Sequence, residues 1–503
     1  MQTLNRYLFG TVFLTGAAVL ILEVAAVRIL APYYGSSLYV FSSVLTVILA
    51  ALSIGYWFGG VRADRKQSID ELYMLIATSG LLVIILLLVA VTVLPAFSAL
   101  FPVSVGPLVF SAGLFFFPAF LLGIVSPYII KIQSVHTPTE EIGSVVGKTF
   151  FWGTLGSIVG SLLSGFYLIP TLGVELSITF VSIILIAVGC VTPLFLGRPL
   201  HKRWIIGVSI LAILFAGCLH LLTQHRNEIY IYHADGLYSS ITISDRIIYG
   251  QNARLLNRDT NNSSAIFYGS TDLVFDYTQF IKVYPELMPE AKTMLMLGGG
   301  AYTVPRTVVA MDPEMTIDVV EIEPVLYELA QTYFDLSDTS RITNYPEDAR
   351  VFLARTDKKY DVIFADLFST NMAAPFHLTT KEYYSLLKEH LNPNGILLIN
   401  YAGKPFPAAP SLTGSIIKTL TTVFSNSEGY MLRPHRKTQT QNIIFIARNG
   451  EVPIKPKEQL FFYSEFDLPF EKMDMKLSSY DTTGEYLLTD DFAPVEKLMA
   501  KQR

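Results

Sequence analysis

The sequence predicts a multi-pass α-helical membrane domain followed by a soluble α/β domain. Of its 503 residues, 51% are hydrophobic and 16% are charged, a composition too apolar for a soluble protein of this length. Long apolar stretches fill the first 222 residues, and alternating strand and helix patterns follow them. We therefore assign residues 1–222 to the membrane domain, 223–270 to a small antiparallel β-subdomain, and 271–503 to the α/β domain.

Seven apolar stretches each approach or exceed the roughly 20 residues that cross a bilayer. They are residues 7–30, 38–60, 72–95, 107–132, 149–169, 173–196 and 204–222. The first stretch is long and carries Glu23 and Arg28, and six more follow it, so we do not read it as a cleavable signal peptide. We expect a multi-pass protein of the cell membrane, with the lipid bilayer as a partner.

Glu23 is an ionisable residue inside the first apolar stretch, where burial of a charge is costly. Such a residue either forms a hydrogen bond to another helix or marks a functional site, and the sequence leaves both readings open. The stretch at 149–169 carries two rows of small residues at four-residue spacing, which predicts close packing of a neighbouring helix.

The orientation in the membrane follows from the loop charges. Lys and Arg residues gather after the second, fourth and sixth apolar stretches, and the positive-inside rule places these loops in the cytoplasm. Seven complete crossings would then place the C-terminal domain outside. Because the chemistry predicted below uses donors made in the cytoplasm, we place the catalytic domain there and keep the outer placement as the alternative.

The soluble part is acidic, with 35 Asp and Glu against 27 Lys and Arg after residue 222, a net charge of −8. This balance argues against nucleic acid as a partner and favours a cationic small molecule. The two cysteines, Cys190 and Cys218, lie inside apolar stretches, and the eight histidines show no ligand spacing. We therefore predict neither a disulfide framework nor a metal site.

The soluble part begins with short alternating runs between residues 229 and 267, which predict antiparallel strands. A helical stretch is expected around 271–287. The runs TMLMLG, TIDVVEIE, RITNY, YDVIFAD and GILLINY then alternate with helical segments at 325–334, 348–355 and 379–390. This alternation predicts a parallel, doubly wound sheet of the Rossmann-like type.

Three consecutive glycines, Gly298, Gly299 and Gly300, end the first strand of that sheet. Without side chains, they let the backbone approach a ligand at the carboxyl end of the strand. A dinucleotide site would need another glycine at position 303, which is Thr303 here. Glu321 closes the second strand about 21 residues later, the separation at which an acidic residue meets ribose hydroxyls. The pattern indicates a nucleoside site.

Two aspartates extend this pattern along the sheet. Asp348 follows the third strand and could accept a hydrogen bond from an adenine amino group. Asp366 ends the fourth strand, at the crevice where doubly wound sheets bind ligands. We interpret Asp366 as the catalytic residue, with a structural cap of the following loop as the alternative. For Glu321 and Asp348 the alternative is an exposed acid at a strand end.

The combined motifs resemble the spermidine synthase family of aminopropyltransferases over about residues 229–445. They are GGG, VVEIEP, DAR, YDVIFAD and HLTTKEYYSLL. LEVAAVRILAPYYG at 22–35, GYWFGGVRADR at 55–65 and LLTDDFAPVE at 487–496 are similar to the fused, multi-pass members. The resemblance implies that the three glycines form the nucleoside loop, Glu321 binds ribose, Asp348 and Ala349 meet the adenine, and Asp366 handles the amine.

The sequence departs from that family at two places. Ser369 stands where a second aspartate is usual, and Asp276, Tyr277 and Thr278 replace a Tyr-His-Glu segment that lines the amine channel. Other side chains could bind the amine instead, with an exposed surface position as the alternative for each. They are Asp272, Asp276, Tyr277, Asp490 and Asp491.

Our leading hypothesis is a membrane-anchored polyamine aminopropyltransferase, a transferase of polyamine biosynthesis. It would use decarboxylated S-adenosylmethionine or S-adenosylmethionine as co-substrate, with no metal, and a small-molecule amine as acceptor. One alternative is an S-adenosylmethionine-dependent methyltransferase or another enzyme that consumes S-adenosylmethionine. Another is a transporter or sensor whose soluble domain binds nucleoside without catalysis. The sequence leaves a homo-oligomer open.

Overall fold

A computed structural model describes the chain except residues 1, 137–140, 198–201, 368–374, 455–472 and 502–503. The chain forms two compact units, Met1–Ile229 and Tyr230–Arg503. The sequence placed the end of the helical part near residue 222, where the apolar stretch stops. The last helix instead continues to Ile229, because helical hydrogen bonds link backbone groups whatever the polarity of the side chains.

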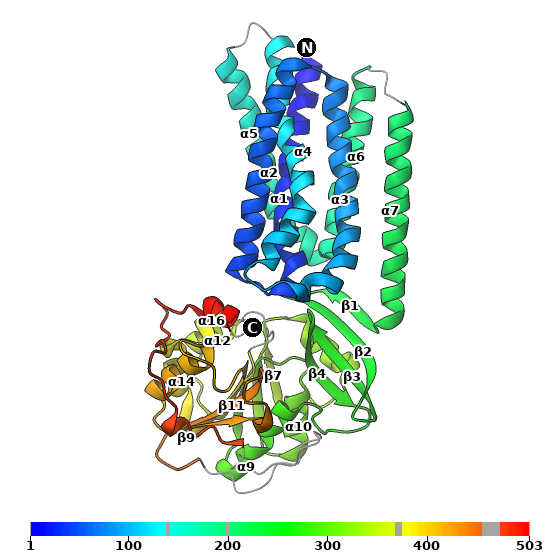
Figure 1. Cartoon of the computed structure of the whole chain (residues 1–503). Helices are drawn as coiled ribbons and strands as arrows, with labels where there is room; N and C mark the ends of the chain where they lie inside the picture. Colours follow the sequence, from blue (N-terminus) through cyan, green and yellow to red (C-terminus); the bar gives the residue numbers. More distant parts are fainter. Residues whose placement is uncertain (1, 137–140, 198–201, 368–374, 455–472, 502–503) are drawn as a thin grey trace. The chain divides into compact units, whose positions relative to one another are not determined.

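The first unit is a bundle of long helices that lie side by side (Figure 1). They are α1 (Gln2–Tyr34), α2 (Leu38–Arg65), α3 (Ile69–Phe97), α4 (Gly106–His136), α5 (Ile142–Leu163), α6 (Ile169–Phe195) and α7 (Lys202–Ile229), with the 3-10 turn η1 (Ser98–Leu100) after α3. The predicted multi-pass helical domain is thereby confirmed. In the described part of the chain, six helical stretches are long and apolar enough to cross a membrane.

The longest of these stretches, Ile142–Phe195, holds two of the seven predicted apolar segments. It contains α5, a π-helical turn η2 (Ser164–Leu168) and α6. At Gly173 the backbone is non-helical, with φ 78° and ψ 175°, so two helices meet there at a kink. At 1.5 Å per residue, 54 residues would far exceed a bilayer about 30 Å thick if they were straight. The stretch is long enough for two crossings. This length accounts for the difference between the six helical stretches of the structure and the seven predicted apolar segments.

Small residues allow α1 and α5 to pack closely, as their spacing predicted. A Cβ atom added at Gly156 would lie 2.0 Å from the carbonyl oxygen of Phe13, and one at Gly160 would lie 2.4 Å from that of Ala17. Larger residues at these positions would push the helices apart. Glu23 lies in α1 and is half-buried, and no hydrogen-bond partner is found for it among the described residues.

The second unit begins with a four-stranded antiparallel sheet in the order β1-β2-β3-β4. Its strands are β1 (Tyr232–Asp235), β2 (Ser240–Ile248), β3 (Gln251–Arg258) and β4 (Asn261–Phe267). Tyr249 and Gly250 both have positive φ and close a two-residue hairpin between β2 and β3. One face of this small sheet buries Ile243 and Leu256 against Leu326.

The main sheet has seven strands in the order β10-β11-β9-β8-β5-β6-β7. They are β5 (Thr293–Leu297), β6 (Thr316–Val320), β7 (Ile342–Tyr345), β8 (Tyr360–Ala365), β9 (Leu391–Gly403), β10 (Ser427–Met431) and β11 (Gln441–Arg448). The strands from β9 to β7 pair in parallel, which confirms the Rossmann-like prediction. The hairpin of β10 and β11 was not predicted, and β11 runs antiparallel to both of its neighbours.

Helices accompany this sheet along the chain. They are α8 (Asp276–Gln279), η3 (Phe280–Val283), α9 (Tyr284–Leu287), α10 (Thr303–Met311), α11 (Val325–Tyr333), α12 (Ala349–Arg355), η4 (Phe376–Leu378), α13 (Lys381–Glu389), α14 (Leu412–Val423), η5 (Pro434–Arg436), η6 (Leu477–Ser479) and α16 (Val495–Lys501). The single helix expected over 271–287 is instead three short segments. Its first residues are extended because Leu273 pairs with Ile266 of β4. Along β5, Met294 and Leu295 point into the separate cores on the two faces of the sheet.

The strand order places a topological switch point at β5. This strand lies between β6 and β8. After β5 the chain adds β6 and β7 on one side of it, and then adds β8 and β9 on the other side. In doubly wound sheets, ligands bind at the carboxyl ends of the strands at such a point. The glycine loop after β5 and Asp366 after β8 therefore lie at the position where a ligand is expected.

Candidate active site

The glycine loop brings the ends of β5, β6 and β8 together. Gly298 has a φ of 90°, which residues with a side chain rarely adopt. A Cβ atom at this position would lie 2.2 Å from the carbonyl oxygen of Asp366. The backbone N–H of Gly298 donates a hydrogen bond of 2.8 Å to the carbonyl of Val320 at the end of β6. Glycine is therefore required here for both conformation and space.

A cavity of about 490 Å³ opens at this edge of the sheet, a size that suits a small-molecule ligand. The glycine loop, the turn between β3 and β4, and the edges of β9 and β11 line it. Its charged lining residues are Arg258, Asp276, Glu321, Asp366 and Arg433. The three predicted glycines, Glu321 and Asp366 thus share one cavity.

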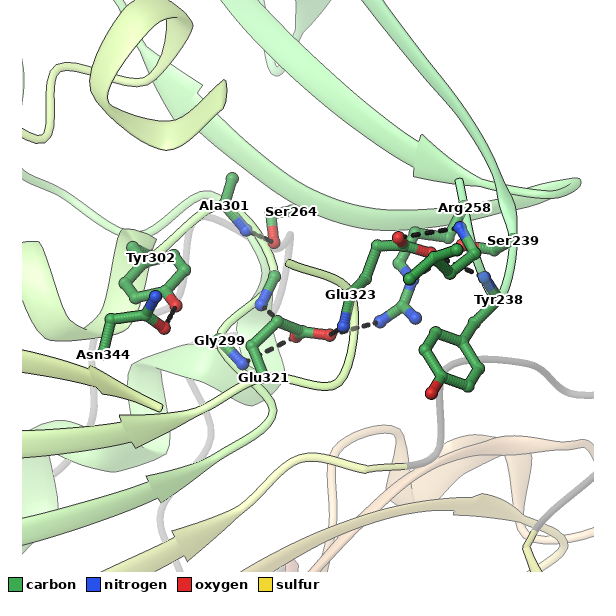
Figure 2. Close-up of polar contacts among 12 residues, drawn as sticks. Tyr238, Ser239, Arg258, Ser264, Gly299, Ala301, Tyr302, Glu321, Glu323 and Asn344 are labelled. Carbon is green, nitrogen blue, oxygen red and sulfur yellow. Dashed lines mark hydrogen bonds and ion pairs between the residues drawn. The ribbon is translucent and has the colours of Figure 1, made fainter. Parts of the chain in front are cut away.

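Glu321 holds the glycine loop in place, as Figure 2 shows. One carboxylate oxygen accepts from the backbone N–H groups of Gly299 (2.9 Å) and Gly300 (3.0 Å). The other accepts from the N–H of Glu323 (3.0 Å) and from a guanidinium nitrogen of Arg258 at 3.5 Å. The side chain is buried. These four donors match the roughly four lone-pair sites of a carboxylate.

The small β-sheet is fixed to the same site by hydrogen bonds (Figure 2). Arg258, at the end of β3, donates to the hydroxyl of Ser239 at 3.2 Å as well as to Glu321. The buried carboxylate of Glu323 accepts from the backbone N–H groups of Leu237 (2.9 Å) and Tyr238 (2.8 Å). Residues of the β-subdomain therefore complete the end of the cavity that is formed by Glu321 and the glycine loop.

Asp366 has the electrostatic setting of a base that works near neutral pH. Burial raises the pKa of Asp366 to about 6, and the hydrogen bond from the Asn400 amide, with the hydroxyl of Tyr277 nearby, limits that rise. The Asn400 amide donates to Asp366 at 2.8 Å, and Asn442 donates in turn to Asn400 at 2.9 Å. This chain of amides fixes the orientation of the carboxylate inside the cavity.

Asp348 is engaged at the start of α12 in this structure. Its carboxylate accepts from the N–H groups of Arg350 (2.9 Å) and Val351 (3.0 Å), which is the geometry of a helix N-cap. Together with His377 at 3.5 Å, these bonds hold the pKa of Asp348 below its usual value. Neither Asp348 nor Ala349 is among the described residues that line the cavity. Their contact with adenine stays a prediction.

Three of the candidate amine-binding aspartates lie away from the cavity lining. Asp490 forms an ion pair with Arg350, and Asp272 lies 3.7 Å from the ammonium of Lys282. Asp491 is exposed. These contacts give Asp272 and Asp490 structural partners, and the binding roles of all three stay predictions.

The segment that replaces Tyr-His-Glu does reach the cavity. Asp276, Tyr277 and Thr278 all line it, and the Tyr277 hydroxyl donates to the carbonyl of Ser263 at 3.2 Å. Burial, with Asp366 beside it, raises the pKa of Tyr277 well above the ordinary value for tyrosine, so the hydroxyl acts as a donor. Ser369, the other departure from the family pattern, lies outside the described residues.

Several site residues were missed in the sequence, among them Arg258, Arg433, Asn400 and Asn442. Arg258 and Arg433 come from segments that show no ligand motif, and only the fold brings them to the cavity. Asn400 did leave a signal, because it is a polar residue within the apolar run GILLINY and is buried in β9. A buried amide needs a partner, and here that partner is Asp366.

The fold and the site together define a class: a doubly wound α/β domain with a glycine loop and a carboxylate at the switch point. Residues 275–456 match the model of the Spermine/spermidine synthase domain. Residues 275–456 therefore form a spermidine synthase-like domain, and in the described part of the chain it follows helices that are long and apolar enough to span a membrane.

Curated relatives match parts of the chain. A probable polyamine aminopropyl transferase of Bifidobacterium longum is 27% identical over 42% of this chain and 50% of its own length. Polyamine aminopropyltransferase 1 of Streptomyces coelicolor is 26% identical over 60% of this chain and 59% of its own. An N-terminal histidine N-methyltransferase of Emericella nidulans is 36% identical over 38% of this chain and 35% of its own. The chain thus spans about half the length of the first two relatives.

Proposed function

We propose that this protein is a membrane-anchored aminopropyltransferase that moves the aminopropyl group of decarboxylated S-adenosylmethionine to an amine. The observation that carries the proposal is the position of Asp366, a carboxylate with a pKa of about 6 that lines the cavity beside the glycine loop. The matching domain and the names of the two aminopropyltransferase relatives support the same donor and acceptor classes.

The reaction requires alignment and removal of one proton. The acceptor nitrogen attacks the carbon next to the sulfonium, so a carbon–nitrogen bond forms while the carbon–sulfur bond breaks and methylthioadenosine leaves. Because a sulfonium is already a good leaving group, the protein contributes mainly by holding the two reactants in line. Asp366 accepts the excess proton of the new ammonium, directly or through a water molecule.

The donor would lie over the ends of β5 and β6. Gly298, Gly299 and Gly300 offer a surface without side chains, and Glu321 would bind the ribose hydroxyls. Since four donors already occupy Glu321, we expect a hydroxyl to displace the longest contact, the one from Arg258 at 3.5 Å. Asp348 and Ala349 remain our proposal for the adenine side.

The proposal predicts the products of one assay. Full-length protein in detergent, given decarboxylated S-adenosylmethionine and a set of amines, should release methylthioadenosine and an amine heavier by one aminopropyl group. Mass spectrometry of the mixture identifies both products. Release of methylthioadenosine without a lengthened amine, or no turnover with any amine, would count against the proposal.

The same assay distinguishes two other functions. The methyltransferase relative favours a run with S-adenosylmethionine, where S-adenosylhomocysteine and a methylated product would indicate methyl transfer. A transporter or sensor would bind methylthioadenosine without any turnover. The half-buried Glu23 would then become the first residue to test in the helical unit.

The side of the membrane on which the catalytic unit lies can be decided independently. In Figure 1, α1 begins at one end of the bundle and α7 ends at the other. The basic ends of α2, with Arg62 and Arg65, and of α4, with Lys131, lie at the end where α1 begins, and residues 35–37 and 98–105 at the other end contain no Lys or Arg. These charges favour a position of the catalytic unit outside the cell, whereas the donor is supplied in the cytoplasm. We propose that the catalytic unit lies in the cytoplasm. A phosphatase that works only outside the cytoplasm, fused after Arg503, should then be inactive in cells. An active fusion would show that the catalytic unit lies outside.

A further inference from the structure

The order of the strands arranges the cavity into two ends. Its lining groups follow the carboxyl edge of the sheet from one side to the other. In order they are Glu321, the glycine loop, Asp366, Asn400, Asn442 and Arg433, from β6, β5, β8, β9, β11 and the end of β10. Neighbouring strands lie about 4.8 Å apart, so β10 is on the order of 14 Å from β8. Arg433 therefore lies beyond Asp366 as seen from the nucleoside end.

This far end of the cavity carries two opposite charges. Asp276 comes from α8, which packs beside β11, and Arg433 follows β10. Burial raises the pKa of Asp276, and the positive charge of Arg433 partly opposes this rise. The two side chains therefore interact electrostatically. No ion pair within 4 Å joins these two described residues, and one carboxylate oxygen of Asp276 is buried without a hydrogen-bond partner. Both side chains therefore line the cavity without neutralising each other in a direct ion pair.

The backbone around Arg433 is held firmly. The side-chain amide of Gln441 accepts from the N–H of Arg433 at 2.6 Å and donates to its carbonyl at 3.0 Å. The backbone carbonyl of the neighbouring Arg436 also accepts a hydrogen bond from Gln441, but Arg436 is not among the described residues that line the cavity. The hairpin thus presents one of these two arginines to the cavity.

We propose that the acceptor is an α,ω-diamino acid rather than a plain diamine. Its ω-amino group attacks the carbon next to the sulfonium while Asp366 takes the excess proton, its carboxylate binds Arg433, and its α-ammonium binds Asp276. A guanidinium pairs with a carboxylate through charge-assisted hydrogen bonds, whereas a diamine would place an ammonium beside Arg433 and meet repulsion. The inference rests on the proposed aminopropyl transfer and names its acceptor class.

Two pairs of probes differ only by the carboxylate: ornithine against putrescine, and lysine against cadaverine. With full-length protein and decarboxylated S-adenosylmethionine, we expect kcat/KM at least about tenfold higher for one diamino acid than for its diamine. Arg433→Gln should lower the value for the diamino acid by about ten- to a hundredfold and thereby abolish its preference over the diamine. Arg436→Gln, a matched change outside the cavity, should preserve the preference.

The outcomes separate this inference from the proposed function. Methylthioadenosine release with putrescine as good as with ornithine, and unchanged by Arg433→Gln, keeps the aminopropyl transfer and overturns the diamino acid. If Arg433→Gln matters only when S-adenosylmethionine replaces the decarboxylated donor, the carboxylate belongs to the donor and the inference is also overturned. If nothing turns over, calorimetric titration of ornithine and putrescine in the presence of methylthioadenosine still tests the preference, and equal binding overturns it.

Discussion

Replacing Asp366 with asparagine is expected to lower kcat for amine transfer by at least about a hundredfold, the usual scale for loss of a general base. Asparagine has the same shape and can still accept the hydrogen bond from Asn400, but it cannot take a proton at neutral pH. Affinity for methylthioadenosine should stay within about threefold, as measured by calorimetry. Asp357→Asn, an exposed change, serves as the control.

The pH profile tests the same assignment. With a pKa of about 6, Asp366 is ionised above that pH, so kcat at saturating amine should fall as the pH drops below 6. Asn400→Ala removes a donor that stabilises the ionised form, which should raise the pKa and move this fall to higher pH by about one unit. An Asp366→Asn variant that keeps full activity, or a profile unmoved in Asn400→Ala, would remove the base from our scheme.

Glu321→Ala is expected to destabilise the second unit and to abolish nucleoside binding. The change leaves the N–H groups of Gly299, Gly300 and Glu323 without their acceptor and Arg258 without its counter-charge. Breaking a buried ion pair on one side typically costs about 3–5 kcal/mol. Thermal unfolding of the full-length protein, followed with and without methylthioadenosine, measures both effects.

A matched surface change provides the comparison. Glu314 is exposed and pairs with the exposed Lys292 at 3.1 Å, so Glu314→Ala should alter stability by no more than about 0.5 kcal/mol. Glu321→Gln keeps one acceptor oxygen and should lie between the two. Equal unfolding temperatures for Glu321→Ala and Glu314→Ala would show that the Glu321 network contributes little to stability.

The convergence of the glycine loop, Glu321 and Asp366 was predictable because parallel strands bring their carboxyl ends to one edge. Residues 298–300, Glu321 and Asp366 each end a strand, so their spacing in the sequence was enough to bring them together. Arg258 and Arg433 were not predictable in this way. One comes from a separate antiparallel sheet and the other follows the hairpin of β10 and β11, and both depend on contacts between distant segments.

Acidic residues also differ in the groups that form hydrogen bonds or ion pairs with them. The sequence does not show these partners. Asp348 looked equivalent to Glu321, yet its carboxylate caps α12. Asp490 looked like a free acid in the C-terminal tail but pairs with Arg350, about 140 residues earlier in the chain. The sequence identifies the acidic residues. The cations and N–H groups that bind their carboxylates can be identified only from the folded structure.

The hydrogen bonds between Glu323 and the turn between β1 and β2 determine where the second unit can be shortened. The matched synthase domain starts at residue 275, but a fragment starting there would lack Arg258 and the backbone donors of Leu237 and Tyr238. It would also lack Ser264, whose hydroxyl accepts from the N–H of Ala301 behind the glycine loop. A fragment that keeps the complete cavity and these hydrogen bonds therefore starts near residue 230, immediately after the last helix of the bundle.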